Sequence, residues 1–275
     1  MSQQPKISLS TEELALSLVL CGYDEVAAGV LKSGLGEKSE NDLQVVFETA
    51  SHSLLSKELL LGINEENLAE SLHPIFKQMM DLFVQSTKMI RCNKEANGAE
   101  EVLMLHRLPG DESLKHEVKH DVVHEFSILK ESEIQPAITS FLKVLAWGEI
   151  ETAHIPLTEE LFNRLVEETK TEDELAFLCE SFHIHHHQEM LKIFLSDFND
   201  YGRRFANISE SLISLKEYSQ IQEAHLILPI HKRLWVVYNE NEDINEPPSL
   251  VLKRMNQDQW IDHLEHLLQK GKLSL

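Results

Sequence analysis

The chain has 275 residues, of which 42% are hydrophobic and 26% charged, a composition typical of soluble globular proteins. Its 25 Lys and Arg stand against 46 Asp and Glu, and the formal net charge of -21 repels nucleic acid and anionic membranes, which makes both poor partners. The first residues lack a basic segment followed by an apolar one, and no run of about eighteen apolar residues occurs, so we expect a cytoplasmic protein.

Three cysteines, Cys21, Cys92 and Cys179, are odd in number, far apart and outside any CxxC motif. This spacing indicates neither a disulfide framework nor a thiolate zinc site. We expect all three to be small buried hydrophobic residues in a reducing compartment.

The N-terminal region predicts several helices in succession. Ser10 and Glu13 have the spacing of a capping box, so residues 11–33 are predicted to form a bent helical pair. A third helix is predicted after Ser39. A fourth is predicted after residue 64, bent at Pro74.

The hydrophobic period then changes from helix to strand. Residues 87–92 and 101–107 predict short strands, followed by a turn at residues 109–111. Even positions of residues 114–128 are apolar or His while the odd positions up to 121 are charged, which predicts one long half-buried strand. Residues 133–147 predict a return to helix.

The second half repeats this order of helices, strands and a closing helix. After the linker 148–156 the predicted elements are helices from Thr158, from Thr171, over 186–198 and over 209–218, a hairpin of 224–230 and 234–238 with a turn at 231–233, a strand over 250–253 and a final helix capped by Asn256. The repeat predicts an α+β fold, an antiparallel β-sheet flanked by two helical blocks with a pseudo-twofold internal duplication. We expect residues 1–147 and 148–275 to be two halves of one intertwined domain.

Residues 116–120, with the sequence HEVKH, match the HExxH pattern of zinc metallopeptidases. That chemistry requires a helix, because only there do both imidazoles and the Glu meet on one side. In the predicted strand, His116 and His120 would be separated by roughly 13 Å, too far to share one zinc ion. We therefore predict neither a metal site nor catalytic residues here.

Histidines also gather at residues 183–187, close to Glu189, where a transition-metal site is conceivable. Consecutive histidines radiate around a helix start instead of converging, so polar residues at a helix junction are the simpler interpretation. A metal-dependent hydrolase centred on the histidine-rich segments is kept as the alternative function.

Other functional motifs are missing from the sequence. There is no GxSxG motif and no GxxxxGK[ST] loop, and we expect no cofactor and no small-molecule substrate. A DNA-binding helical head is a weaker interpretation, because residues 40–55 contain no Lys or Arg for a recognition helix.

The order of elements resembles the EspG family of chaperones associated with ESX (type VII) secretion. The matching segments are the phrase LSTEEL at residues 9–14, the strands within 87–129 and the ending from 225 to 268. The Gly-Arg pair that is usual in the last hairpin of that family is missing, and Lys232-Arg233 matches it only in part. The resemblance implies a quasi-twofold α+β scaffold that holds an aggregation-prone secretion substrate in the cytoplasm without catalysis.

We therefore expect a cytoplasmic binding protein and no enzyme: a secretion chaperone or adaptor for a helical, secreted protein partner. The partner surface is predicted on the second helical block and the C-terminal hairpin, where apolar anchors are available. The predicted partner-binding residues are Phe182, Met190, Ile193, Leu226 and Trp235. Each of them is alternatively an ordinary core residue.

Overall fold

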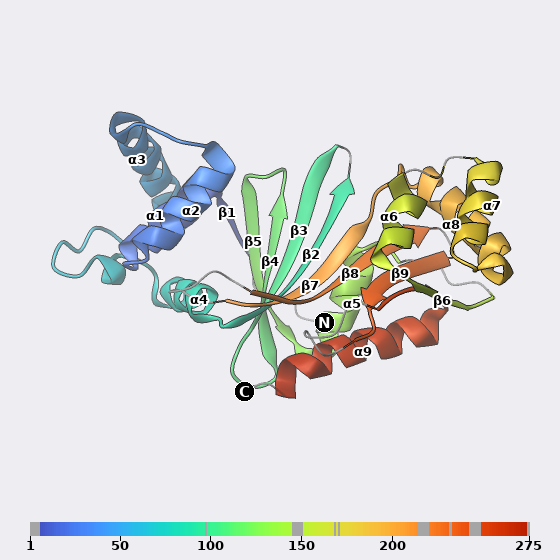
Figure 1. Ribbon diagram of the computed structural model, residues 1–275. Helices are drawn as coiled ribbons and strands as arrows, with labels where there is room; N and C mark the ends of the chain where they lie inside the picture. The colour runs from blue at the N-terminus through green and yellow to red at the C-terminus, as the bar shows by residue number, and fades with distance from the viewer. Residues whose placement is uncertain are drawn as a thin grey trace. The chain divides into compact units, whose positions relative to one another are not determined.

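The computed structural model describes residues 6–96, 98–144, 151–167, 169, 171–213, 220–230, 233–241 and 249–273 (Figure 1). The chain divides into two units that interleave along the sequence. Unit 1 contains Met1–Ile90, Glu95–Ile134 and Leu212–Gln220, and unit 2 contains Arg91–Lys94, Gln135–Ser211 and Ile221–Leu275. The predicted division into residues 1–147 and 148–275 stays a prediction.

Unit 1 combines N-terminal helices with antiparallel strands, of which β1 pairs with β5, β5 with β4, and β4 with β3. Its elements are β1 (Ile7–Ser10), α1 (Thr11–Leu20), α2 (Asp24–Leu35), α3 (Glu40–Ser56), the 3-10 helix η1 (Leu68–Ser71), α4 (Pro74–Gln85), the two ends of β2 (Lys88–Ala96, of which Arg91–Lys94 belongs to unit 2), β3 (Ala99–Arg107), β4 (Glu112–Lys119) and β5 (Val123–Lys130). In Figure 1, α1, α2 and α3 lie together at the blue end of the chain. The strands predicted at 87–92 and 101–107 are confirmed as β2 and β3, each longer than expected.

Unit 2 repeats helices and antiparallel strands, with β8 paired to β9, β9 to β10, and β10 to β6. Its elements are α5 (Glu131–Phe141, which begins in unit 1), β6 (Ala153–Leu157), α6 (Glu159–Glu167), α7 (Glu172–Ser181), the 3-10 helix η2 (His185–His187), α8 (Gln188–Asp200), β7 (Ala206–Leu212), β8 (Gln220–Ile230), β9 (Arg233–Asn239), β10 (Leu250–Met255) and α9 (Gln257–Leu273). The predicted α+β class with an antiparallel sheet is confirmed.

The predicted helix starts are confirmed where a side chain caps the backbone. At α1, the amide of Glu13 donates to Ser10 Oγ (3.2 Å) and the amide of Ser10 donates to Glu13 Oε2 (2.7 Å), so the capping box is complete. Thr171 and Glu174 form the same reciprocal pair at the start of α7. Gly22, with a φ of 82°, separates α1 from α2 within the predicted helical pair, because glycine adopts a left-handed conformation without steric strain.

Pro74 begins a helix and does not bend one. The predicted helix after residue 64 is divided into η1 and α4, and Pro74 is the first residue of α4. A proline lacks the amide hydrogen that would be unpaired at that position anyway, so its ring fits the first turn.

The single strand predicted over residues 114–128 is wrong. The segment is a hairpin of β4 and β5, and His120 and Asp121 form its turn with φ values of 52° and 61°. In the pairing, His116 lies opposite Phe126 and Val118 opposite His124, so even positions face the same side on both strands. The alternation therefore continues in phase through the turn and hides it.

Two further expectations fail in the second half. The helix predicted over 209–218 is wrong for residues 209–212, which belong to β7, where Ile208 and Glu210 are buried at alternate positions. Residues 214–218 of that prediction lie outside the described residues, as do 145–147 of the predicted helix and 231–232 of the predicted turn. The linker predicted over 148–156 contains most of β6.

Each unit has its own hydrophobic core. In unit 1, α1, α3 and α4 pack on the strands around Leu14, Leu54 and Phe126. In unit 2, α6, α7 and α8 pack around Phe194 and Trp235. Burying one large apolar side chain stabilises the folded state by about 1.5–3 kcal/mol, so these two clusters hold the helices on the strands.

The cysteines are positioned as hydrophobic residues. Cys92 and Cys179 are buried and Cys21 is partly buried. Burial raises the pKa of the Cys92 thiol to about 12 and that of Cys21 to about 11, so both are thiols near neutral pH. No helix in the described part of the chain combines the length and apolar character that a bilayer span requires.

Candidate functional site, a groove beside α3

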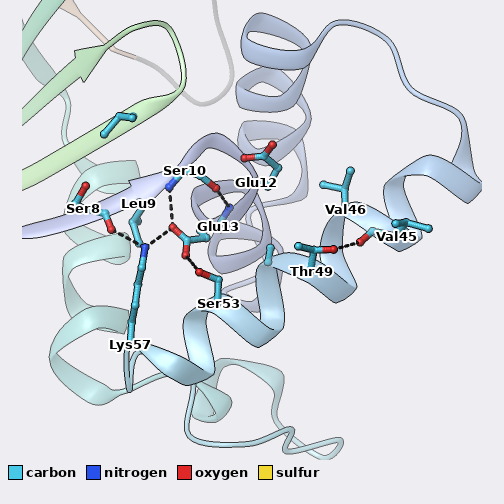
Figure 2. A pocket seen from close by; sticks show the side chains of 12 residues that line it. Ser8, Leu9, Ser10, Glu12, Glu13, Val45, Val46, Thr49, Ser53 and Lys57 are labelled. Atoms are coloured by element: carbon cyan, nitrogen blue, oxygen red, sulfur yellow. Dashed lines mark hydrogen bonds and ion pairs between the residues drawn. The ribbon is translucent and has the colours of Figure 1, made fainter.

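An open groove of about 560 Å³ lies in unit 1 between α3 and the corner where β1 runs into α1 (Figure 2). We call it the α3 groove. Its lining residues are Ser8, Leu9, Ser10, Glu12, Glu13, Val45, Val46, Thr49, Ala50, Ser53, Lys57 and Val123.

One wall of the groove is a stripe along α3. Val45, Thr49 and Ser53 are four residues apart, and residues with this spacing share one side of a helix. Leu54 on the neighbouring side of α3 is fully buried in the core, which fixes the rotation of the helix. Val45 is left 63% exposed, an unusual position for a branched apolar side chain.

The opposite wall is built around the carboxylate of Glu13, whose side chain is 3% exposed. It accepts hydrogen bonds from the amide of Ser10 (2.7 Å), Ser53 Oγ (2.5 Å) and Lys57 Nζ (2.7 Å). Burial alone would raise the pKa of Glu13, but these donors outweigh it and hold the pKa below its usual value. The network stabilises an ionised carboxylate and joins α3 to α1, as Figure 2 shows.

The free edge of β1 also faces the groove. The amide of Thr11 donates to the carbonyl of Val122 (3.1 Å), so Thr11 and Leu9 direct their backbone groups toward β5. Ser8 and Ser10 therefore direct theirs away from β5. The Ser10 amide is taken by Glu13, and the Ser8 carbonyl accepts from Lys57 Nζ (3.0 Å).

The charged residues that line the groove are two glutamates and one lysine. Neither α1 nor α3 contains a Lys or Arg, whereas Glu12, Asp42 and Glu48 add negative charge to these two helices. Lys57 follows α3 directly and is paired with Glu13. Glu12, in the lining, forms no ion pair with any residue of the described chain.

The five predicted partner-binding residues do not line this groove. Phe182, Met190, Ile193, Leu226 and Trp235 belong to the core cluster of unit 2, the first four as half-buried residues at its margin. Trp235 is fully buried, and its Nε1 donates to Asp197 Oδ2 (2.8 Å). Its expected role as an exposed anchor is corrected, because a side chain without exposed surface presents nothing to a partner. For the other four, partner binding stays a prediction.

Sequence reasoning missed the α3 groove. Its walls come from residues 8–13 and 45–57, and the contacts between them follow from tertiary packing. The one available signal is Val45, an apolar residue on the polar side of the predicted amphipathic helix, two positions before the core residue Phe47.

The two histidines of the HExxH segment differ in their exposure to solvent. His120 is exposed in the hairpin turn, and His116 is buried on β4, where its Nε2 lies 2.9 Å from Nδ1 of His124. Burial lowers the pKa of His116 well below its usual value, and lowers those of His106 and His124 to about 4. All three imidazoles are therefore neutral at pH 7.

The described residues contain no group of three or more His, Cys, Asp or Glu side chains placed to hold a metal ion. At the second histidine segment, His185–His187 form η2, and the rings of His186 and His187 lie 3.9 Å apart. The expectation that the protein binds no metal remains a prediction.

A second, polar pocket of about 590 Å³ lies in unit 2 between α9 and strands β6, β9 and β10. There, His263 Nε2 lies 2.9 Å from Nδ1 of the buried His225, and Glu223 Oε1 lies 3.0 Å from Nε2 of His225. Burial, with His225 beside it, lowers the pKa of His263 to about 3. A base this weak does not accept a proton near neutral pH, so the pair holds α9 on the strands and is a poor candidate for proton transfer.

Comparison with known proteins gives a family and a distant structural likeness. The model of the family described as "Uncharacterised protein YfjC" matches residues 6–258. No curated protein matches the chain. Among solved structures, the Mycobacterium tuberculosis type VII secretion system chaperone EspG5, in complex with the PE25-PPE41 dimer, is similar over 90% of both chains, with 6% identity and a TM-score of 0.49. At these values the EspG resemblance stays a prediction.

Proposed function

Because the chain belongs to the YfjC family, whose description names no activity, its own geometry must indicate its role, and we propose that it binds another protein through the α3 groove. The observation that carries this proposal is an open, largely apolar depression with an exposed Val45 on its rim. Partner side chains placed against Val45, Val46 and Val123 would remove apolar surface from water, at about 25 cal/mol per Å².

The fixed spacing of the groove walls supports the same role. The Glu13 network fixes the spacing between α1 and α3, so the groove exists before a partner arrives. A preformed site loses less conformational entropy on binding.

The finer form of the proposal is a cytoplasmic chaperone or adaptor for a secreted helical protein. It follows from the order of elements described above. Genes for a secretion ATPase and for small helical proteins beside this gene would support it. A neighbourhood without them, conserved among relatives, would contradict the secretion role and leave the groove proposal intact.

Site-specific cross-linking tests the proposal. A photoreactive phenylalanine analogue at position 45 should capture a specific protein, which is identified and then purified for binding assays. The control places the same analogue at Ile221 of unit 2, which is 68% exposed. The proposal also requires V45D to weaken binding of the identified protein by at least about ten-fold, with I221D unchanged. Equal capture at both positions, or equal affinity of V45D, would contradict it.

A further inference from the structure

Two outward backbone groups of β1 are already occupied, which disfavours pairing with an additional strand. Extended peptides usually bind a sheet by pairing with free backbone groups of an edge strand. Here, the outward amide of Ser10 is bound by Glu13, and the outward carbonyl of Ser8 is bound by Lys57. A lysine at this position is a known protection of sheet edges. An added strand would have to displace Lys57, which would leave the buried Glu13 carboxylate without its cation.

The wall along α3 suits the packing of another helix. Thr49, Ala50 and Ser53, which line the groove between Val45 and Lys57, all have small side chains. Helices pack by placing the ridges of one into the grooves of the other, with axes roughly 8–10 Å apart. Small side chains on one helix allow this approach, and Val45 provides an apolar contact at one end.

The charges of the two bounding helices indicate the sign of the partner. Glu12 lies in the lining without an ion pair among the described residues, and Glu48 lies exposed on α3. Lys57 is the only basic residue of the lining and is neutralised by Glu13. An acidic partner would be repelled, whereas Lys or Arg beside the apolar face of a partner would meet Glu12.

We infer that the occupant of the α3 groove is a basic amphipathic helix of a partner protein, with small aliphatic residues on the buried face and a Lys or Arg next to Glu12. This inference rests on the proposed function and adds the conformation and charge of the partner. It excludes β-strand addition at β1 as the binding mode.

Labelled synthetic peptides test the inference on the full chain by fluorescence anisotropy. The first is a hydrocarbon-stapled helix with Leu and Ala at i, i+3, i+4 and i+7 and with Lys on the flanks. The second replaces each Lys by Glu in the same stapled helix. The third has the composition of the first arranged as alternating Val and Lys, which favours an extended strand.

The basic helix should bind at least about ten-fold more tightly than either of the others, with an affinity that falls as NaCl is added. E12Q should weaken only the basic helix, whereas V45D should weaken every peptide that binds. E65Q, at an exposed acidic position of the same unit, serves as the matched control.

Tighter binding of the extended peptide, equal binding of the acidic helix, or no binding of any peptide would overturn the inference. None of these outcomes decides the proposed function, which is tested separately by capture at Val45 and by the V45D affinity.

Discussion

Nζ of Lys57 lies 2.7 Å from Oε2 of Glu13, and the two residues join the end of α3 to the first turn of α1. The same Nζ donates to the carbonyl of Ser8. One ammonium group therefore holds a helix, an edge strand and a second helix in register. The spacing between the two walls of the α3 groove depends on this pair.

Replacing Lys57 by Met should destabilise the protein by about 1–2 kcal/mol, because the Glu13 carboxylate would lose its cation. The full cost of breaking a buried pair is not expected, since the Lys57 side chain is 40% exposed and solvent screens the interaction. Urea unfolding measures the difference. K32M, which breaks an exposed pair with Glu37, is the control and should change stability by less than about 0.5 kcal/mol. Equal effects of both substitutions would contradict the structural role of Lys57.

Glu13 should contribute to loss of stability in acid. Its pKa is lowered in the folded state, so its contribution is present above the unfolded pKa of 4.5 and is lost as the pH falls through the folded pKa. E13Q removes this titration. Unfolding midpoints measured from pH 5 downward should fall less steeply in E13Q than in the wild type. Parallel curves would show that the carboxylate does not titrate as described.

The buried histidines should lower the stability of the protein at a higher pH than Glu13 does. Burial lowers the pKa of His106 and of His124 to about 4, against 6.5 for a free side chain. A lowered histidine pKa means that stability is present above pH 6.5 and decreases as the pH falls toward 4. H106L should reduce this slope, because neither ring nitrogen of His106 has a hydrogen-bond partner in the described part of the chain. H52Q, at an exposed position of α3, should keep the wild-type slope.

Trp235 should behave as a core residue. W235D should abolish folding, and W235F should cost about 1–3 kcal/mol, because Asp197 Oδ2 would lose its indole donor while staying buried. Asp197 also pairs with Arg233 (3.0 Å), which keeps the carboxylate compensated. Thermal melts followed by circular dichroism measure both variants. A W235D protein that melts like the wild type would restore Trp235 as a surface anchor. F177S, at an exposed position of α7, is the control.

Separate expression of residues 1–147 and 149–275 should give poorly folded fragments. Leu212–Gln220 belongs to unit 1 and Arg91–Lys94 to unit 2, so the cut removes a segment from each unit. Within unit 1, for example, the amide of Ile213 donates to the carbonyl of Thr87 (2.8 Å). Broad, non-cooperative melting by circular dichroism is the expected result. Two monomeric fragments with sharp transitions would show two independent domains.

Features that depend on residues close together in the sequence, such as helix caps, are predicted best. The helix starts at Ser10 and Thr171 are predictable because a cap is a local exchange of hydrogen bonds over three residues. The hairpin of β4 and β5 was missed because its turn, His120 and Asp121, contains no Gly or Pro and keeps the alternation in phase. Strand β7 was missed because its alternation is polar, with buried Glu210 and Ser211.

The candidate site was harder to predict than the fold. The α3 groove needs Glu13 to meet Lys57, 44 residues later, and no pattern in one sequence encodes that meeting. For the predicted anchors, residue type alone does not distinguish an interface residue from a core residue. The residue type of Trp235 predicts an interface anchor, yet an indole is equally suited to a core when a buried carboxylate accepts a hydrogen bond from its N–H.

The interleaving of the two units has a consequence for synthesis. Most of unit 1 leaves the ribosome by Ile134, but its last segment starts only at Leu212. At about 5–20 residues per second, those 78 further residues (212 − 134) take roughly 4–16 s. During that interval Thr87 lacks the partner that Ile213 later provides, and the nascent strands are open to wrong pairing. A slower ribosome would lengthen the time during which the strands of unit 1 lack this segment.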